Sequence, residues 1–299
     1  MLPSHDRFPY SAIVSRPTFS WPEGRGLAFY VAVCVESFAY NAAGLGTPLT
    51  PGHSHPNNFN WSWREYGNRV GSWRLIELFD AFQLPMTVLL NSACYEHCPE
   101  LVAAHRARGD EIVGHGRTNS ENQNGLSRED ERRLLREATD AFRRHEGKAP
   151  RGWMSPGANA NVCTEDLLAQ EGYRYTLDWP MDDQPVWMKT EAGPLLSVPY
   201  PHELNDIPAM IFHDSTARDF TDTSIDNFDE MLRQSEQQPL VFGITVHNFI
   251  AGQPFRLKQF RRLLEHITRH RDAVWFTTAG AIADHYASVV PPPSDARPG

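Results

Sequence analysis

Residues 27–36, LAFYVAVCVE, form a continuous apolar run that ends in a charged residue. A run of this length, rich in valine and aromatic residues, is typical of a strand buried on both faces of a parallel sheet. A second run, 240–247, LVFGITVH, has the same character and ends in a histidine. Both runs predict central strands of an α/β sheet, and each places an ionisable side chain at the carboxyl end of its strand.

Shorter apolar runs and amphipathic patterns alternate along the rest of the chain. Apolar residues recur at helical spacing within 70–79, 134–142 and 257–267. Strands that alternate with helices predict an α/β fold with right-handed crossovers, either a barrel or a doubly wound sheet. The other predicted strands are 85–91, 111–114, the residues just after 151, 173–178, 195–199, 209–212 and 273–276.

The chain has 299 residues, enough for one large α/β domain or two small ones. Prolines at positions 3, 9, 17 and 22, with aromatic residues between them, predict that residues 1–26 form an ordered arm across a surface. The main domain is expected at 27–288. The proline-rich stretch 289–299 is predicted to be a tail.

Charge and composition exclude several classes of partner. The chain carries 28 basic and 37 acidic residues, a formal net charge of −9, and its densest basic region, 128–144, alternates with acids. This alternation predicts a solvated, salt-bridged helix face rather than a surface for nucleic acid or anionic membrane. The start of the chain has no signal-peptide layout, and no apolar run reaches the roughly 18 residues of a membrane span. We therefore expect a cytoplasmic protein.

Polar residues stand where several predicted strands begin or end. Glu36, His115 and His247 each end a strand, Asp178 closes another, and Arg151 opens one. In a parallel α/β barrel the carboxyl ends of all strands open on one face, so residues far apart in sequence meet there. One acid, two histidines and an arginine are a sufficient set of groups for an active site.

Each of these residues also has a purely structural interpretation. Glu36 would then be a capping or loop carboxylate, His247 a satisfied core histidine, and Arg151 the partner of a surface acid. A catalytic role is favoured for Glu36, because a charge that ends a buried strand is costly unless it is used or paired. It is also favoured for His115, because a histidine between two glycines has little to pack against.

Five stretches resemble the polysaccharide deacetylase (NodB-homology) superfamily. The likeness is greater to its branch of metal-independent-type allantoinases and cyclic imide hydrolases, which residues 8–33 and 61–101 also resemble. The resemblance covers nearly the whole chain and implies a distorted (β/α) barrel of the NodB-homology type in a single domain. In order, the five stretches are YVAVCVESF (30–38), VGHGRTN (113–119), PRGWMSPG (150–157), LDWPMDDQPVW (177–187) and GITVHN (243–248).

The resemblance also implies which residues would hold a metal. Members that deacetylate sugars have a catalytic aspartate and a metal-binding aspartate after the first strand, and His-x-x-x-His after the third. These positions fall on Glu36, Ser37, His115 and Asn119, so two of three metal ligands are replaced. A hydroxyl or a neutral amide is a poor zinc ligand. The resemblance therefore implies no metal, with zinc bound by Glu36, His115 and His247 as the alternative.

Hydrolysis without a metal favours a substrate with a good leaving group. The nitrogen of a cyclic imide or ureide is flanked by electron-withdrawing groups, so it leaves more easily than an acetylated amine. Our hypothesis is a hydrolase that opens a C–N bond of such a ring, with Glu36 as general base and His247 as general acid. His115 and Asn119 would hydrogen-bond the carbonyl or the water, and Arg151 would stabilise charge.

Other residues are candidates for binding the substrate. Trp153, Trp179 and Phe249 are predicted to wall a small flat ring beside Asp178, and Arg256 to reach a substrate carboxylate or a neighbouring subunit. The resemblance implies a homo-oligomer, a dimer or a tetramer.

Two functional alternatives remain open. One is a metal-dependent N-deacetylase of a sugar or another small N-acyl compound, and the other is a non-catalytic binding protein on the same barrel. Within the ring-opening hypothesis, allantoin itself is not assigned. Ser37 stands where an allantoinase is expected to carry a second glutamate, and Asn248 where the branch is expected to carry a proline.

Overall fold

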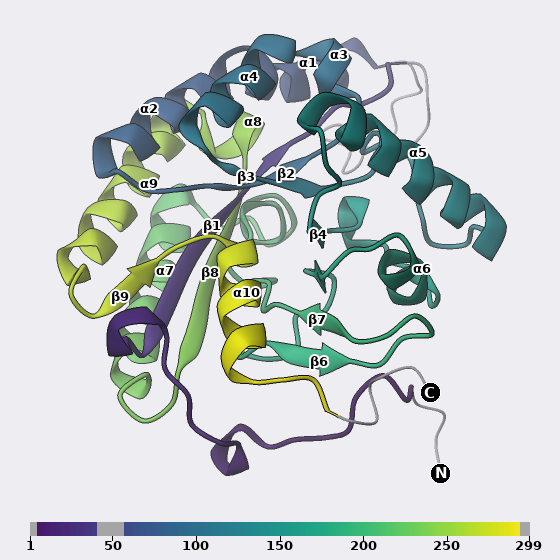
Figure 1. The fold of residues 1–299 in the computed structure, drawn as a ribbon. Coiled ribbons are helices and arrows are strands. Elements are labelled where there is room, and N and C mark those ends of the chain that lie inside the picture. Colours follow the sequence, from purple (N-terminus) through teal and green to yellow (C-terminus); the bar gives the residue numbers. More distant parts are fainter. Residues whose placement is uncertain (1–4, 41–56, 294–299) are drawn as a thin grey trace.

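A curled nine-stranded sheet forms the centre of the structure, a computed structural model that describes residues 5–40 and 57–293 (Figure 1). Strands follow the order β6-β7-β5-β4-β3-β2-β1-β8, and β9 pairs with the start of β1. The pairs are parallel except for β6 with β7. The strands are β1 Leu27–Val35, β2 Thr87–Leu90, β3 Glu111–Gly114, β4 Gly152–Trp153, β5 Tyr175–Thr176, β6 Val186–Met188, β7 Leu195–Ser197, β8 Leu240–His247 and β9 Val274–Phe276.

Helices cover the convex face of this sheet (Figure 1), so the predicted single-domain distorted barrel is confirmed, in the form of a half-barrel. The longest, α5, begins after the capping residue Ser127, whose side chain accepts from Asp130 N, and ends at Gly147 with a positive φ of 72°. The helices are α1 Asn58–Tyr66, α2 Ser72–Phe82, α3 Cys94–His97, α4 Pro99–Arg108, α5 Arg128–Glu146, α6 Thr164–Gln170, α7 Ala217–Gln234, α8 Asn248–Ala251, α9 Pro254–Ile267 and α10 Ala279–Val289.

One strand prediction was wrong, and one strand was not predicted. Residues 209–212 lie in a π-helical turn, Pro208–Phe212, in which His213 N donates to Pro208 O. Proline starts a helical turn readily, and a short apolar run has no periodicity that separates strand from helix. The sequence pattern also misses β6, an edge strand of three residues that is too short to show a period.

The side chains of β1 alternate between two layers of the core. Leu27, Phe29, Val31, Val33 and Val35 pack outward against the helices. Ala28, Tyr30, Ala32 and Cys34 face the interior of the half-barrel. Because side chains two residues apart lie on one face of a strand, Glu36 continues the interior row just beyond the end of β1.

Helix α10 covers the amino-terminal ends of the central strands (Figure 1). Ala279 N donates to Thr87 Oγ1 at 3.0 Å, and Gly280 N donates to Glu111 Oε2 at 2.8 Å. Thr87 and Glu111 are the first residues of β2 and β3. The carboxyl ends of the strands therefore open on the side of the half-barrel away from α10.

Residues 5–26 lie across the outside of the domain and lead into β1. The Arg7 guanidinium donates to both carboxylate oxygens of Asp166 at 3.1 Å, which connects the start of the arm to α6. Arg16 pairs with Asp182, and Trp21 is buried and donates to the backbone at the start of β8. Residues 1–4 of the predicted arm and 294–299 of the predicted tail lie outside the described residues.

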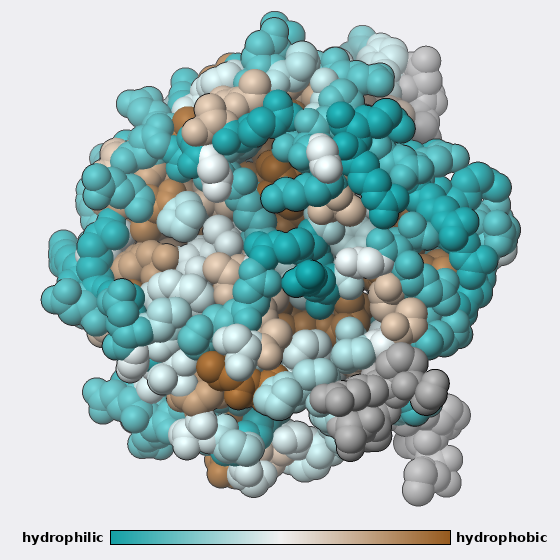
Figure 2. Space-filling view, in the orientation of Figure 1, coloured by the Kyte–Doolittle hydropathy of each residue, from teal (hydrophilic) through white to brown (hydrophobic). Residues whose placement is uncertain are grey.

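The surface of α5 has the predicted salt-bridged character. Arginines on this helix pair with acids three residues earlier: Arg132 with Glu129, Arg133 with Asp130, and Arg143 with Asp140. Hydrophilic side chains dominate the face of the molecule drawn in Figure 2. Among the described residues, none of the helices combines the length and the apolar composition that crossing a bilayer requires.

Candidate active site

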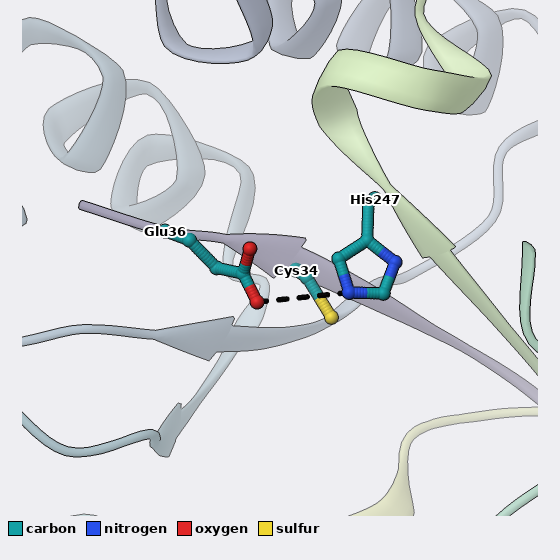
Figure 3. Close-up of side chains that lie close together, drawn as sticks. All are labelled: Cys34, Glu36 and His247. Atoms are coloured by element: carbon teal, nitrogen blue, oxygen red, sulfur yellow. Dashed lines mark ion pairs between the residues drawn. The ribbon is translucent and has the colours of Figure 1, made fainter. Parts of the chain in front are cut away.

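Cys34 of β1, His247 of β8 and Glu36, which follows β1, meet at the carboxyl ends of these strands (Figure 3). The parallel register sets Cys34 beside His247, and Glu36 lies two residues beyond Cys34 on the same face. Glu36 Oε1 is 3.6 Å from His247 Nε2. Glu36 and His247 are only 4% and 6% exposed, so this carboxylate and imidazole interact in a site from which water is largely excluded.

The His247 ring is oriented by a buried aspartate that precedes the π-helical turn. His247 Nδ1 donates to Asp206 Oδ1 at 2.7 Å, and the backbone N–H of His247 donates to Asp206 Oδ2 at 2.8 Å. A proton held on Nδ1 leaves Nε2 directed at Glu36. An aspartate in this position also stabilises a positive charge on the ring.

His115 is the second imidazole that contacts Glu36. Its Nδ1 donates to Met154 O at 2.7 Å, which leaves Nε2 at 3.5 Å from Glu36 Oε1. The sharp turn after this residue depends on Gly116, whose φ is +70° and where a Cβ atom would lie 2.6 Å from Pro156. The two imidazoles predicted to meet Glu36 therefore do so.

Two asparagines complete the surroundings of Glu36. Asn119 Nδ2 donates to Glu36 Oε1 at 2.7 Å, and Asn91 Nδ2 lies 3.5 Å from Asn119 Oδ1, so the orientation of the Asn119 amide is set from both ends. Asn91 Oδ1 also accepts from Ser37 N at 2.9 Å. Glu36 Oε2 is buried and has no hydrogen-bond partner among the described residues. It is thus the carboxylate oxygen whose capacity to accept a hydrogen bond is unused among these residues.

Glu36 and His247 carry opposite charges at neutral pH. Burial alone would raise the pKa of Glu36, but His247, His115 and Arg64 outweigh it and lower this pKa below its ordinary value. Burial alone would lower the pKa of His247, but Cys34, Asp206 and Glu36 outweigh it and raise this pKa well above its ordinary value. Burial raises the pKa of the Cys34 thiol to about 11. At neutral pH the site therefore holds a carboxylate, an imidazolium and a neutral thiol.

A pocket of about 380 Å³ opens above these groups. Its size falls within the range of small-molecule sites. The floor is polar and includes Glu36, His115, Asn119, Asp178 and His247. The walls are largely apolar, with Phe38, Met154, Leu177, Ile207, Phe212 and Phe249 among them.

Arg64 from α1 is a pocket residue that the sequence analysis did not identify. Its side chain is 4% exposed, and its guanidinium carbon lies 4.8 Å from the centroid of the Phe38 ring and 5.7 Å from that of Phe249. Burial lowers the pKa of Arg64 to about 10, against the effect of Glu36. Arg64 therefore stays positively charged at neutral pH and is a cation in the pocket.

Asp178 lines the pocket as predicted, but its carboxylate is held by hydrogen bonds from Ser155 and Thr176. It accepts from Ser155 N at 2.7 Å, from Ser155 Oγ at 2.9 Å and from Thr176 Oγ1 at 3.1 Å. Phe249 also lines the pocket, with its ring 5.7 Å from that of His247. These contacts fix the loop after β4 and one wall of the pocket.

The structure does not bring Arg151 to this site. Arg151 precedes β4 and pairs with Asp284 of α10 and with Glu111, at the amino-terminal ends of the strands. A residue that opens a parallel strand lies at the opposite end of the barrel from residues that close one. Arg64 supplies the pocket with the positive charge that was predicted for Arg151.

Two tryptophans and one arginine also differ from the prediction. Trp153 is fully buried in the core against Tyr173, and Trp179 donates to Glu165 and packs under Phe8 of the arm, so neither lines the pocket. Arg256 is stacked over Phe255 in a small separate cavity behind Asp206. Its charge acts on the Asp206 carboxylate rather than on a group in the pocket.

The residues at the metal positions of related deacetylases do not fit a metal ion. Asn119 presents its amide N–H to Glu36, and an N–H donor cannot ligate a metal. Ser37 replaces an anionic ligand with a hydroxyl, so His115 alone is a normal ligand of the three. The alternative of Glu36 and His247 with His115 is not supported either, because within the described residues these two cluster with Cys34 instead.

Known proteins described as polysaccharide deacetylases are similar to this chain. A family model described as polysaccharide deacetylase matches residues 63–176. A Schizosaccharomyces pombe protein, provisionally described as a polysaccharide deacetylase, is 28% identical over 306 residues, which cover 92% of this chain and 94% of that protein. A Helicobacter pylori peptidoglycan deacetylase is 25% identical over 254 residues, which cover 74% of this chain and 85% of that protein.

A solved structure resembles the whole fold. The crystal structure of Puue allantoinase superposes with a TM-score of 0.83 at 26% identity, and the match covers 95% of this chain and 99% of that one. The family model spans His115 and Asn119 but neither Glu36 nor His247. The match to the allantoinase extends over nearly all of the chain.

Proposed function

The chain belongs to the polysaccharide deacetylase family, and we propose that it opens a C–N bond of a small cyclic imide or ureide without a metal ion. It is a hydrolase of carbon–nitrogen bonds, of the deacetylase or allantoinase type. The observation that carries the proposal is the Glu36 carboxylate between two imidazoles, with an amide N–H where a metal ligand would stand.

Glu36 acts as the general base on the attacking water. Its lowered pKa keeps it ionised at neutral pH, and its unpartnered Oε2 is free to accept a proton from the water. As the water oxygen attacks the ring carbonyl, its proton passes to the carboxylate and the carbonyl electrons move onto oxygen. The result is a tetrahedral intermediate with one negative charge.

His247 acts as the general acid for the leaving nitrogen. Its raised pKa keeps Nε2 protonated, and Asp206 holds the opposite ring nitrogen. When the intermediate collapses, the C–N bond breaks and the nitrogen takes this proton, so the ring opens to a carboxylic acid and an amide. The proton on Glu36 then returns to His247, whose Nε2 is 3.6 Å from Glu36 Oε1.

Arg64 stabilises the oxyanion, with His115 and Asn119 as further hydrogen-bond donors. A charged donor in a site that excludes water stabilises a developing anion more strongly than the same donor in water. Arg64 meets both conditions, since it is a buried cation beside the pocket. It takes the role that a metal ion fulfils in metal-dependent hydrolases.

The pocket favours a compact ring over a polymer. A volume of about 380 Å³ accommodates a small heterocycle, and its apolar walls suit a flat ring better than a hydroxyl-rich sugar. The similarity to an allantoinase also supports ring opening. Allantoin has a strongly polar ureido substituent, so apolar walls favour a ring with an apolar substituent or none.

A metal-dependent N-deacetylase remains the second candidate. It is favoured by the similarity to a protein described as a peptidoglycan deacetylase. An unactivated acetamide is a harder substrate than an imide because its amine is a poorer leaving group. This candidate therefore needs the metal ion that Ser37 and Asn119 are poorly suited to bind.

One experiment separates the two candidates. The metal content of the purified protein is measured, and turnover is followed on succinimide, hydantoin, dihydrouracil, allantoin and N-acetylglucosamine with and without a chelator. We expect ring opening that continues in the presence of a chelator and in protein from which the metal has been removed. Deacetylation that a chelator abolishes and zinc restores would instead establish the second candidate.

The pH dependence tests the positioning role of Asp206. In the mechanism, kcat/KM rises as Glu36 ionises and falls as His247 loses its proton, so activity has a broad plateau around neutrality. Asp206→Asn removes an anion that raises the pKa of His247. The alkaline limb should therefore move to lower pH, with a loss on the order of 10²-fold at neutral pH, while the acidic limb of Glu36 stays in place. An alkaline limb that does not move would exclude this role.

Arg64 can be tested by removing its charge and then restoring it. Arg64→Met should lower kcat by about 10²- to 10³-fold with a smaller change in KM, because the oxyanion exists only after attack. Arg64→Lys should recover part of this loss. A fall in melting temperature with kcat unchanged in Arg64→Met would mean that Arg64 serves only to support α1.

A further inference from the structure

We propose that Cys34, Glu36 and His247 form a site for a soft divalent metal ion such as zinc, and that metal bound there inhibits the enzyme. The site differs from the family's metal position, because it uses neither Ser37 nor Asn119. Metal binding follows from the ligand geometry alone. The inhibitory effect also rests on the proposed function, since it requires Glu36 and His247 to be the base and the acid.

The backbone brings the three ligands together. Cys34 is paired with His247 across β1 and β8, and the side chain of Glu36 lies on the same face two residues further on. Sγ of the cysteine, a carboxylate oxygen and a ring nitrogen all lie within 4.8 Å of one another, in side chains that are all buried. Figure 3 shows the thiol on β1 and the carboxylate just beyond the end of β1, both directed toward the His247 ring. This proximity comes from strand register and does not depend on a flexible loop.

The ligand chemistry suits zinc. Zinc is bound by thiolate, imidazole and carboxylate groups at about 2.0–2.3 Å, so these ligands would have to approach one another by roughly 1 Å. Metal-binding histidines usually donate their other ring N–H to a carboxylate, as His247 Nδ1 does to Asp206 at 2.7 Å. The buried Glu36 Oε2 has no hydrogen-bond partner among the described residues and is free to bind an ion. The geometry and this unpartnered oxygen are independent observations that point to the same ligand class.

Occupation of the site would inhibit because it removes both catalytic groups. A bound ion takes the carboxylate electrons that accept the proton from water, and it replaces the Nε2 proton that His247 donates to the leaving nitrogen. A thiolate and a carboxylate together also cancel the charge of a divalent ion. Such an ion is a weak Lewis acid and a poor substitute for the groups it displaces.

The test combines metal binding with turnover in metal-depleted protein. Zinc is titrated against a chromophoric chelator, and cobalt is added separately to observe the near-ultraviolet thiolate-to-cobalt charge-transfer band. We expect one equivalent of metal to bind, the cobalt band to appear, and succinimide turnover to fall over the same zinc range and to recover with chelator. Cys34→Ala should lose the band and weaken zinc binding by about 100-fold or more.

Cys98→Ala is the matched control, because this thiol does not line the pocket. It should keep the band, the zinc affinity and the inhibition. Equal zinc binding by Cys34→Ala and the unmodified protein would overturn the site, and binding without loss of turnover would overturn the inhibition. If the metal-depleted protein turns over but binds no zinc, only this inference fails. If it is inactive and zinc restores it, the proposed metal-free function fails.

Discussion

Replacement of Glu36 by glutamine is expected to reduce kcat for ring opening by on the order of 10³- to 10⁴-fold. Glutamine keeps the size of the side chain and can still accept a hydrogen bond from Asn119, which donates to Glu36 Oε1 at 2.7 Å. It cannot accept a proton from water at neutral pH. The loss should therefore appear in the chemical step, measured by steady-state kinetics on succinimide or hydantoin, with a smaller change in KM.

Two further measurements separate this effect from damage to the fold. The acidic limb of the kcat/KM profile, which reports ionisation of Glu36, should be absent in the residual activity of Glu36→Gln. The thermal unfolding midpoint should fall, because the lowered pKa of Glu36 means that its charge stabilises the fold at neutral pH, so circular dichroism at the assay temperature is the check that the variant is folded. Full activity in Glu36→Gln would exclude Glu36 as the base and leave the water to another group.

The sequence alone predicts much of the site, because parallel strands obey simple rules. The apolar runs before Glu36 and His247 are long enough to identify β1 and β8, and their ends define the active face. The period-2 alternation of β1, which the sequence itself shows, also places Cys34 on the same face as Glu36. His115 could be predicted in the same way from the end of β3.

Other residues of the site have no such local signal. Arg64 comes from helix α1 and Asp206 from an irregular segment before a π-helical turn, so neither ends a strand. Their positions depend on how these segments pack against the strands, which is long-range information. The position of Arg151 does follow from the sequence, because a residue that opens a parallel strand lies at the amino-terminal end of the barrel, away from the active face. Trp153 was misplaced because a side chain on a strand can point away from the pocket into the core, and one sequence does not decide which.

Replacement of His247 by glutamine is expected to cost about 10²- to 10⁴-fold in kcat, by an amount that depends on the substrate. A general acid matters most when the leaving nitrogen is strongly basic. Loss of the acid should therefore affect dihydrouracil, whose leaving nitrogen becomes part of a urea, more than succinimide, whose leaving nitrogen becomes part of a less basic amide. The measurement is kcat for both substrates in the unmodified protein and in His247→Gln.

The ratio of the two losses distinguishes a catalytic from a structural role. A variant that merely disturbs the pocket should slow both substrates to a similar extent, because misplacement of Glu36 affects the attack on either carbonyl. A loss confined largely to the substrate with the poorer leaving group requires that His247 donate a proton as the C–N bond breaks. Glu36→Gln supplies the comparison, since the base acts before that bond breaks and its removal should affect the two rings alike. Equal losses in His247→Gln would exclude His247 as the general acid and leave the leaving nitrogen to be protonated by water or by the Glu36 carboxylic acid.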